Sequence, residues 1–538
     1  MVDVNDDAHA PTRPAWNPRD VGLLVRRFLV DYGRNGTNLV LLAVVPAAFV
    51  LAAAPSMAQA AKVLGGTQNG PAVEAVTAGW SAAFLSALAM YFQVSASRAA
   101  DRRLVIAGTS RLTLATARVA TGVALGLLAS VVAVLTLAMR QPGTNMARVL
   151  MGTVMFALVY VGIGAVVAVL APEPVNGAVI VLFVWIVDVF FGPALTGSSS
   201  MVLRFLPTHY VSLWMVDLPR GHGGPGELLM ALVWLVLALT AAVLVTVGRS
   251  RHQHHRRFAR WAHRARGVRG PHTPGQLPTG LRMGARDWAR TPVLWVLLVL
   301  VPTVFVLLSD AITPPGQTRA VLFEGGVKVS HVVDPADIHG GTMAPIAVAS
   351  LATLVGVFVV LDARAADRRL RLAGQRAVVL IVTRLALVFT AGAVASAASL
   401  GLAWTVFDPV QGGVYVIGVL VLAATYALAG VLLGPVFGRL SGTFLAFLLP
   451  FLDVGIAQSP MLREEPASWA QWLPGWGGSR VMLTGAMGHG WGEAAAIWAA
   501  TGWLLVLGIA ALVQLAAVSG TTKLARFRKW RSADSPAV

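Results

Sequence analysis

The sequence alternates long apolar runs with short polar segments, and this alternation limits the possible folds more than any other feature. A helix of about 20 apolar residues spans the hydrocarbon core of a bilayer. Only 12% of the 538 residues are charged, about half the share that is usual in soluble proteins. We therefore predict an all-α polytopic membrane protein and exclude a soluble enzyme or a disordered chain. The twelve predicted spans are 37–57, 74–95, 116–139, 148–171, 176–198, 227–248, 292–309, 343–361, 381–405, 413–436, 440–459 and 492–518.

The basic residues are distributed unevenly among the polar segments. Five of these segments, together with Arg439, hold 33 of the 42 Lys and Arg residues, and all of them fall on one side if the spans alternate. The positive-inside rule then places both termini in the cytoplasm of a multi-pass plasma-membrane protein. The same loops explain the net charge of +18 without a nucleic-acid partner. Residues 1–20 contain four Asp and no basic region before an apolar core, so we expect no cleaved signal peptide.

The two halves of the sequence repeat one another. The segment RAADRRL occurs at 98–104 and again at 364–370, and the match continues to Arg118 and Arg384. This alignment contains 11 identities in 21 positions at one offset of 266. Later landmarks recur in the same order: Asp188 and Asp453, Leu206-Pro207 and Leu473-Pro474, Gly-His-Gly at 221–223 and 488–490, and Gly-Glu at 226–227 and 492–493.

The repeat predicts two copies of a six-span unit. Because six is even, both copies insert with the same orientation, related by an axis along the membrane normal. A transport path between two such halves is the natural consequence. The expected organisation is an N-terminal tail with an amphipathic interfacial helix (1–36), the first unit (37–248), a basic cytoplasmic linker (249–290), the second unit (291–518) and a basic C-terminal tail (519–538).

Each copy places RAADRRL between its second and third spans, on the predicted cytoplasmic side. The segment is expected to form a short interfacial helix that serves either as a basic anchor or as a docking element for a cytoplasmic partner. Docking is favoured because the two copies share the whole segment RAADRRL and not only its positive charge. An amphipathic helix is also predicted before the first span, from apolar residues at helical spacing between Val21 and Leu29. The candidate coupling residues are Arg98, Asp101, Arg102, Arg103, Arg364, Asp367, Arg368 and Arg369.

Asp188 and Asp453 lie within apolar runs, where a carboxylate is costly and suggests a function. Helical rise places both in the outer third of the bilayer. They bind substrate or protons, or they have a structural role near the headgroups or as caps of the extracellular helices that follow, and the structural role is favoured.

The segments 199–226 and 460–491 are too polar to span and are expected to close the outer mouth as short extracellular helices or re-entrant turns. A histidine beside glycine binds a metal or protons, or is an ordinary loop residue, and the second interpretation is favoured. Five linker histidines are assigned to a lipid-facing basic segment rather than to a metal site. The candidate gate residues are Pro207, His222, Glu227, Pro474, His489 and Glu493.

The chain lacks the motifs of a nucleotide-hydrolysing enzyme. No GxxxxGK[ST] segment occurs, and none of the four lysines follows a glycine, so we expect no P-loop here. HExxH and GxSxG are also absent from the sequence, and no cysteine is present. We therefore expect a non-enzymatic chain without a cofactor of its own.

Taken together, the pattern resembles a type-2 ABC transporter permease with two permease units fused in one chain. The resemblance covers nearly the whole length and is carried by VRRFLVDYGRNGTNLVLLAVVPAAFVL, its echo RDWARTPVLWVLLVLVPTVFVLL and the RAADRRL segments at the position of the family's coupling helices. It implies separate ATPase subunits, in two copies, that bind ATP and Mg²⁺ and dock on 98–111 and 364–377, with 18–34 as a flanking contact. It also implies export of an antibiotic, drug or other amphipathic small molecule.

Two other classes stay open at this stage. A secondary transporter resembling the major facilitator family also has twelve spans in two halves, and Asp101-Arg102-Arg103 is similar to part of its loop signature. Such a carrier is expected to place carboxylates near the bilayer midplane, farther in than Asp188 and Asp453. A membrane-embedded transferase is the third class, and the sequence contains no convergent polar cluster for it.

Overall fold

The computed structural model describes residues 16–34, 36–141, 145–171, 173–196, 201–216, 221–252, 275–289, 291–490 and 493–518. Most of the predicted basic linker, the first 15 residues and the whole predicted C-terminal tail, 519–538, lie outside these residues. The first half contains α1 (Pro18–Gly33), α2 (Gly36–Val63), α3 (Gly70–Ala96), α4 (Arg98–Ile106), α5 (Arg111–Arg140), α6 (Met146–Leu170), α7 (Pro174–Phe190), a 3₁₀ helix (Met201–Phe205), α8 (His209–Met215) and α9 (Pro225–His252).

The second half repeats this order with additions. It contains α10 (Gln276–Ala289), α11 (Pro292–Ile312), β1 (Thr318–Glu324), β2 (Val327–Val333), α12 (Pro335–Leu372), α13 (Ala377–Val406), α14 (Gly412–Pro450), a π helix (Phe451–Ala457), a 3₁₀ helix (Ser468–Trp472), α15 (Trp476–Met487) and α16 (Ala494–Val518). Ten described helical segments are long and apolar enough to cross a membrane. The chain is therefore a mostly helical protein with a membrane-embedded architecture, as predicted.

Every predicted span lies on helical structure, with two differences in form. The fifth segment corresponds to α7, which at 17 residues is a shorter apolar helix. The tenth and eleventh segments share α14, whose backbone leaves helical geometry at Gly438, with φ 74° and ψ −166°. A positive φ of this kind favours glycine. Because the kink at Gly438 falls between the two predicted segments, the chain changes direction where the sequence predicted a boundary.

Two elements depart from the purely helical prediction. The hairpin of β1 and β2 is antiparallel and turns at Gly325-Gly326, both with positive φ. It lies between α11 and α12, where the offset between the halves rises from 256 at Phe49 and Phe305 to 266 at Arg98 and Arg364. The helix α10 occupies part of the segment that was expected to be a linker. It packs on α13 as α1 packs on α5, so both halves begin with a helix lying on the third helix of the bundle.

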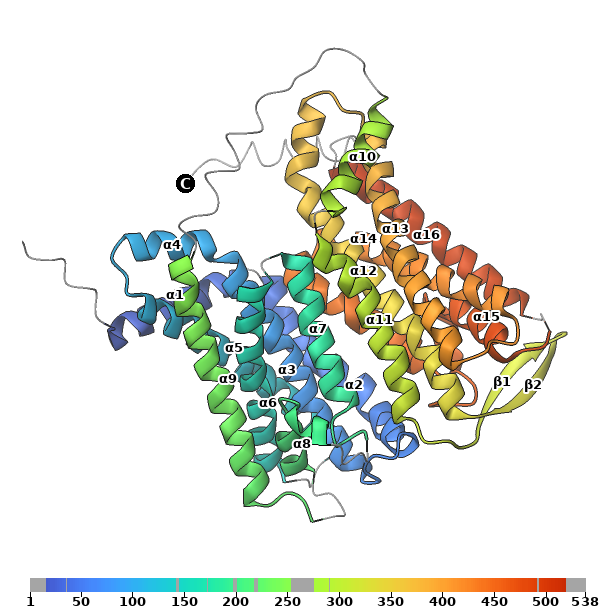
Figure 1. Cartoon of the computed structure of the whole chain (residues 1–538), viewed down its shortest axis with the longest axis horizontal. Coiled ribbons are helices and arrows are strands. Elements are labelled where there is room, and N and C mark those ends of the chain that lie inside the picture. Colours follow the sequence, from blue (N-terminus) through green and yellow to red (C-terminus); the bar gives the residue numbers. More distant parts are fainter. Residues whose placement is uncertain are drawn as a thin grey trace, which may run out of the picture.

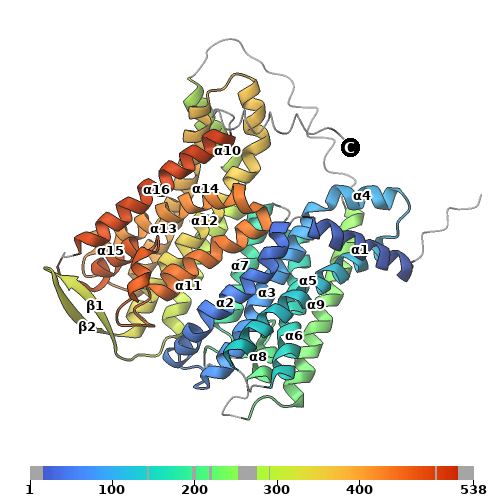
Figure 2. The same cartoon turned by 180° about the vertical axis from the view of Figure 1, so that it is seen from behind.

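Figure 1 shows the two halves side by side, the first in blue and green and the second in yellow to red. Figure 2 gives the reverse view, in which α14 passes close to α2 and α3. We call the end that carries α4 the arginine-rich end and the end that carries β1 and β2 the hairpin end. The halves meet through α2, α3 and α7 on one side and α11, α12, α14 and the π helix on the other.

Equivalent helices inside each half cross at equivalent glycines. A Cβ on Gly164 of α6 would meet the carbonyl oxygen of Ala87 in α3, and a Cβ on Gly430 of α14 would meet that of Thr353 in α12. Both pairs are related by the offset of 266. Close backbone approach at small residues is how helices pack within a bilayer. The duplication therefore extends to the packing of the core.

Candidate functional site

The aspartates of the two RAADRRL segments make equivalent side-chain contacts. Asp101 forms an ion pair with Arg118 of α5 at 2.6 Å, and Asp367 forms one with Arg384 of α13, also at 2.6 Å. Both carboxylates are partly buried. Each segment therefore fastens itself to the helix that follows it in its own half. Sequence reasoning grouped the two aspartates with the docking residues, but their observed partners lie inside the chain.

A matched turn closes each segment. Gly108 and Gly374 adopt φ of 96° and 90°, respectively. The amide of Thr109 donates to the carbonyl of Leu104, and Gln375 donates to Leu370 in the same way. This Schellman arrangement satisfies the last carbonyls of the helix and requires a left-handed residue, which glycine supplies. The end of each segment is therefore sharply defined.

The arginines of the segments divide into two groups. Arg98 is partly buried and donates to the carbonyl of Ala168 at 3.0 Å, and Arg364 is partly buried as well. The other four are exposed in both copies at the arginine-rich end: Arg102, Arg103, Arg368 and Arg369. These four place exposed positive charge at equivalent positions of the two halves, whereas Arg98 is bonded to the carbonyl of Ala168.

The segments differ in the direction of the helix. In the first half α3 ends at Ala96 and α4 is a separate nine-residue helix lying across the arginine-rich end (Figure 1). In the second half α12 runs without a break through Arg364 to Leu372. Ser97 stands at the first junction, and its Oγ donates to Asp101 Oδ2 at 2.7 Å. The equivalent residue, Ala363, makes no such bond.

Asp188 fastens the short helix α8 to the core of the first half. Its carboxylate accepts from the hydroxyl of Tyr160 in α6 at 2.8 Å. It also accepts from the backbone amide and the hydroxyl of Thr208, at 3.3 and 2.6 Å. Thr208 is the N-cap residue of α8. This geometry agrees with the structural alternative considered from the sequence, in which the aspartate caps a following helix.

Asp453 makes the equivalent arrangement in the second half. Its carboxylate accepts from the hydroxyl of Tyr426 at 2.5 Å and from the amide of Gly475 at 2.6 Å. Gly475 is the N-cap residue of α15. Gln458 adds a third bond through Nε2 at 3.1 Å. Tyr160 and Tyr426 are related by the offset of 266, which is the sequence signal that would have identified them as partners of the aspartates.

The six candidate gate residues do not converge on one mouth. The helix α8, which follows Pro207, packs against α3, α6 and α9 of its own half, and α15, which follows Pro474, packs against α12, α14 and α16. His222 lies 3.3 Å from Glu227. Glu493 instead accepts from Arg480 at 2.6 Å. Each set therefore closes the hairpin end of its own half, and a gating role stays a prediction.

One titratable group near these residues has a shifted pKa. Burial, together with the smaller effect of the charges of Arg204 and His222, lowers the pKa of His209, the first residue of α8, to about 4. Its imidazole is therefore neutral at pH 7. The position has no histidine counterpart in the second half, where Gly475 and Trp476 occupy the equivalent positions.

The seam between the halves is aromatic and closed. Phe49 stacks on Phe451 with ring centroids 5.9 Å apart, and Phe92 stacks on Phe358 at 6.4 Å. Phe92 and Phe358 are equivalent residues of the two halves. Offset stacking of this kind adds to the energy of apolar burial. The residues of the seam resemble ordinary core positions in the sequence, so they were not predicted as a site.

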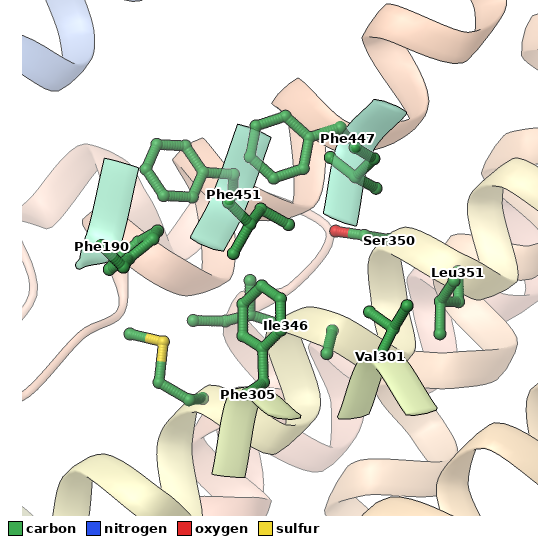
Figure 3. Close-up of a pocket in the computed structure, with 12 residues that line it drawn as sticks. Phe190, Val301, Phe305, Ile346, Ser350, Leu351, Phe447 and Phe451 are labelled. Atoms are coloured by element: carbon green, nitrogen blue, oxygen red, sulfur yellow. The ribbon is translucent and has the colours of Figure 1, made fainter. Parts of the chain in front are cut away.

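Side chains fill the seam on the side of the first half, whereas the equivalent position in the second half borders a small cavity. Phe84 packs against Trp185 and Phe447 at 5.1 and 5.5 Å. Ser350 takes the equivalent position in the second half and lines a small cavity (Figure 3). This cavity of about 10 Å³ is too small for a drug-sized ligand. The Ser350 hydroxyl is buried and has no hydrogen-bond partner.

A much larger cavity of about 1320 Å³ opens near the arginine-rich end. It is bounded by α1, the end of α3, α4 and the kink of α14. Six arginines and one aspartate line it, together with apolar and aromatic side chains. Tyr32 Oη and both amide atoms of Gln93 line it as well and are buried without hydrogen-bond partners. Burial raises the pKa of the Tyr32 phenol above its usual value.

No protein-family model matches the chain, and no curated protein is significantly similar to it.

Proposed function

We propose that the chain is the permease subunit of an ATP-driven ABC exporter in the plasma membrane. Twelve spans form two six-span halves with both termini in the cytoplasm, and two copies of a separate ATPase subunit bind ATP and Mg²⁺ below them. The permease moves an amphipathic small molecule outward along the seam. The observation that carries this proposal is the pair of equivalent segments that each expose two arginines at the same end of the molecule.

The attachment of these segments suits a coupling role. Each segment is bound to the next helix by a short ion pair, Asp101 with Arg118 and Asp367 with Arg384. A displacement of the exposed face is therefore passed to α5 and α13 instead of being absorbed by a loose loop. Energetic coupling between distant sites requires an element of this kind that both sites can bias.

The large cavity suits an amphipathic substrate on the cytoplasmic side. Its volume exceeds that of a typical drug site. The excess of arginine favours a substrate with an anionic or strongly polar group, and the unpartnered Tyr32 and Gln93 offer further hydrogen bonds. Phe92 lines this cavity and also stacks on Phe358 in the seam. A substrate bound in this cavity therefore lies next to the contact of Phe92 with Phe358, which must open for transport along the seam.

The two buried carboxylates favour the ATP-driven alternative over an ion-coupled carrier. A proton-coupled carrier needs a carboxylate that exchanges its proton with the path. Asp188 and Asp453 each accept several hydrogen bonds within one half, and both join core tyrosines to helix caps. These bonds support a structural role for both carboxylates.

The test is the double variant Arg102→Ala/Arg368→Ala in proteoliposomes that also contain the partner ATPase. We expect transport per ATP hydrolysed to fall by at least roughly tenfold, which corresponds to about 1.4 kcal/mol of lost coupling. The matched control is Arg282→Ala/Arg286→Ala, which removes two exposed arginines of α10 and leaves 98–111 and 364–377 unchanged. Unchanged coupling in the first variant, or an equal loss in the control, contradicts the docking role.

A further inference from the structure

Three side chains with metal-binding atoms meet at the hairpin end of the second half. They are Glu324 at the end of β1, His331 in β2 and His489 in the segment before α16, and their ligand atoms all lie within 4.8 Å of one another. The two imidazole rings are nearly parallel, with centroids 6.0 Å apart. Among the described residues no other group of three such side chains meets this criterion.

The hairpin places two of these side chains on one face. In the observed register Ala320 is opposite His331 and Glu324 is opposite Val327. Opposed residues share a face, and alternate residues along a strand share it too. Glu324 and His331 therefore lie on the face whose Ala320 and Leu322 are buried. The two-residue turn with positive φ at both glycines, which is the geometry of a tight hairpin, fixes this register.

Separate contacts hold the hairpin against the segment that carries His489. Glu324 Oε1 accepts from the backbone amide of His489 at 2.8 Å. Arg480 of α15 donates to the carbonyl of Val321 at 3.1 Å and to Glu493 at 2.6 Å. The arrangement of the three ligands is therefore supported by bonds that do not use the imidazole nitrogens.

His331 and Glu324 contact each other at a distance expected of an ion pair or of two ligands of one cation. His331 Nε2 lies 2.9 Å from Glu324 Oε1, but the geometry does not direct a hydrogen bond, and this buried nitrogen has no hydrogen-bond partner. A cation about 2 Å from each atom, beside the line that joins them, would bind both. A buried polar atom without a partner is uncommon in folded proteins and requires a reason of this kind.

Among the residues that the structure describes in the first half, no such arrangement occurs. There the equivalent histidine, His222, contacts Glu227 beside it in the chain, at 3.3 Å. In the second half Glu493, the equivalent of Glu227, is engaged by Arg480 instead. His489 therefore lies beside the inserted hairpin, which the first half lacks.

We propose that Glu324, His331 and His489 bind one divalent transition-metal ion of the zinc class, which fastens the inserted hairpin to the segment before α16. Two imidazoles and one carboxylate suit Zn²⁺, with water in a remaining position, and imidazole ligands do not suit Ca²⁺ or Mg²⁺. This inference does not depend on the proposed transport cycle.

The test is a Zn²⁺ titration of the metal-free full chain in detergent, purified without a polyhistidine tag. The five linker histidines, His252, His254, His255, His263 and His272, are replaced by glutamine in every sample to remove competing ligands. We expect one Zn²⁺ per chain and an increase in the melting temperature. Co²⁺ in place of Zn²⁺ should give visible d–d absorption that reports nitrogen and oxygen ligands.

Three single variants and one control decide the assignment. Glu324→Gln, His331→Ala and His489→Ala should each weaken Zn²⁺ binding by at least roughly tenfold, since loss of even an outer-shell partner has that effect. His222→Ala, in the equivalent loop of the first half, should bind as the parent does. The melting temperature without metal shows whether a variant is folded. Equal Zn²⁺ affinity in the three variants and the control, or no stoichiometric binding by the parent, overturns the proposal.

Discussion

The two halves keep the same contacts but arrange the chain differently at both ends. At the arginine-rich end, RAADRRL forms the separate helix α4 in the first half and continues the long helix α12 in the second. Asp101 and Asp367 nevertheless make the same ion pair at the same distance. What has been retained is the attachment of the segment and the exposure of its arginines. The direction of the helix differs where the junction sequences differ, FQVSAS at 92–97 and FVVLDA at 358–363.

At the hairpin end the halves differ by an insertion. The first half connects α2 to α3 through a short segment that includes an isolated bridge between Gly65 and Thr196. The second half inserts β1 and β2 at the corresponding place. The aspartates that hold α8 and α15 are unaffected by this difference. The insertion is therefore an addition to an intact bundle, and the comparison separates the shared frame from features of one half.

The largest expected effect tests the shared frame. Asp188→Ala and Asp453→Ala each leave a buried tyrosine hydroxyl and a helix-cap amide without an acceptor. We expect each variant to lose about 4 kcal/mol of stability, since each buried orphan costs about 1–3 kcal/mol. Tryptophan fluorescence during thermal unfolding in detergent measures the loss. If the two losses differ severalfold, the tethers are not equivalent.

A pH titration sharpens the comparison, because only the first half has His209. Its pKa is about 4 in the folded protein and about 6.5 when unfolded. Protonation therefore favours unfolding, so the stability contribution is complete above pH 6.5 and is lost as the pH falls towards 4. The expected loss is up to about 3 kcal/mol. His209→Gln should remove this part of the acid sensitivity. An unchanged pH profile in that variant contradicts the assignment.

The ion pairs Asp101–Arg118 and Asp367–Arg384 should differ modestly in strength. Arg118 is 8% exposed and its guanidinium lies 3.6 Å from the ring centroid of Phe28 in α1, whereas the side chain of Arg384 is 19% exposed. We expect Arg118→Ala to cost about 2 kcal/mol and Arg384→Ala about 1 kcal/mol, because burial and the added cation–π contact strengthen the first pair. The same thermal unfolding assay compares them. The reverse order would show that the first pair gains nothing from its contact with α1.

The sequence predicted the features that depend on composition and repetition. The apolar spans, the amphipathic helix α1 and the boundary near Gly438 follow from local pattern, and each lies on helical structure or at a kink. The equivalence of Asp188 and Asp453 followed from the repeat. Their partners Tyr160 and Tyr426 lie at an offset of 266, within one residue of the offset of the aspartates. Comparing every polar residue of the spans between the two halves would therefore have identified these tyrosines.

Other features were not predicted, either because a sequence signal was overlooked or because only the three-dimensional structure shows them. The strand VKVSHVV alternates and follows Glu-Gly-Gly, which is a hairpin signal that the assumption of an all-helical chain concealed. The helix α10 is as amphipathic as α1, with Leu277, Leu281 and Trp288 at helical spacing, but this pattern lies in a segment that was interpreted as a basic linker. The large cavity joins α1 to the kink of α14, which are hundreds of residues apart. No local pattern encodes a cavity of that kind.

The most direct test of the central claim is to purify the tagged chain from its native membrane in mild detergent and to identify what accompanies it by mass spectrometry. We predict a P-loop ATPase at two copies per chain, and its loss from the Arg102→Ala/Arg368→Ala variant. A chain that purifies alone and transports substrate when only an ion gradient is supplied would contradict the account, and it would establish a secondary carrier.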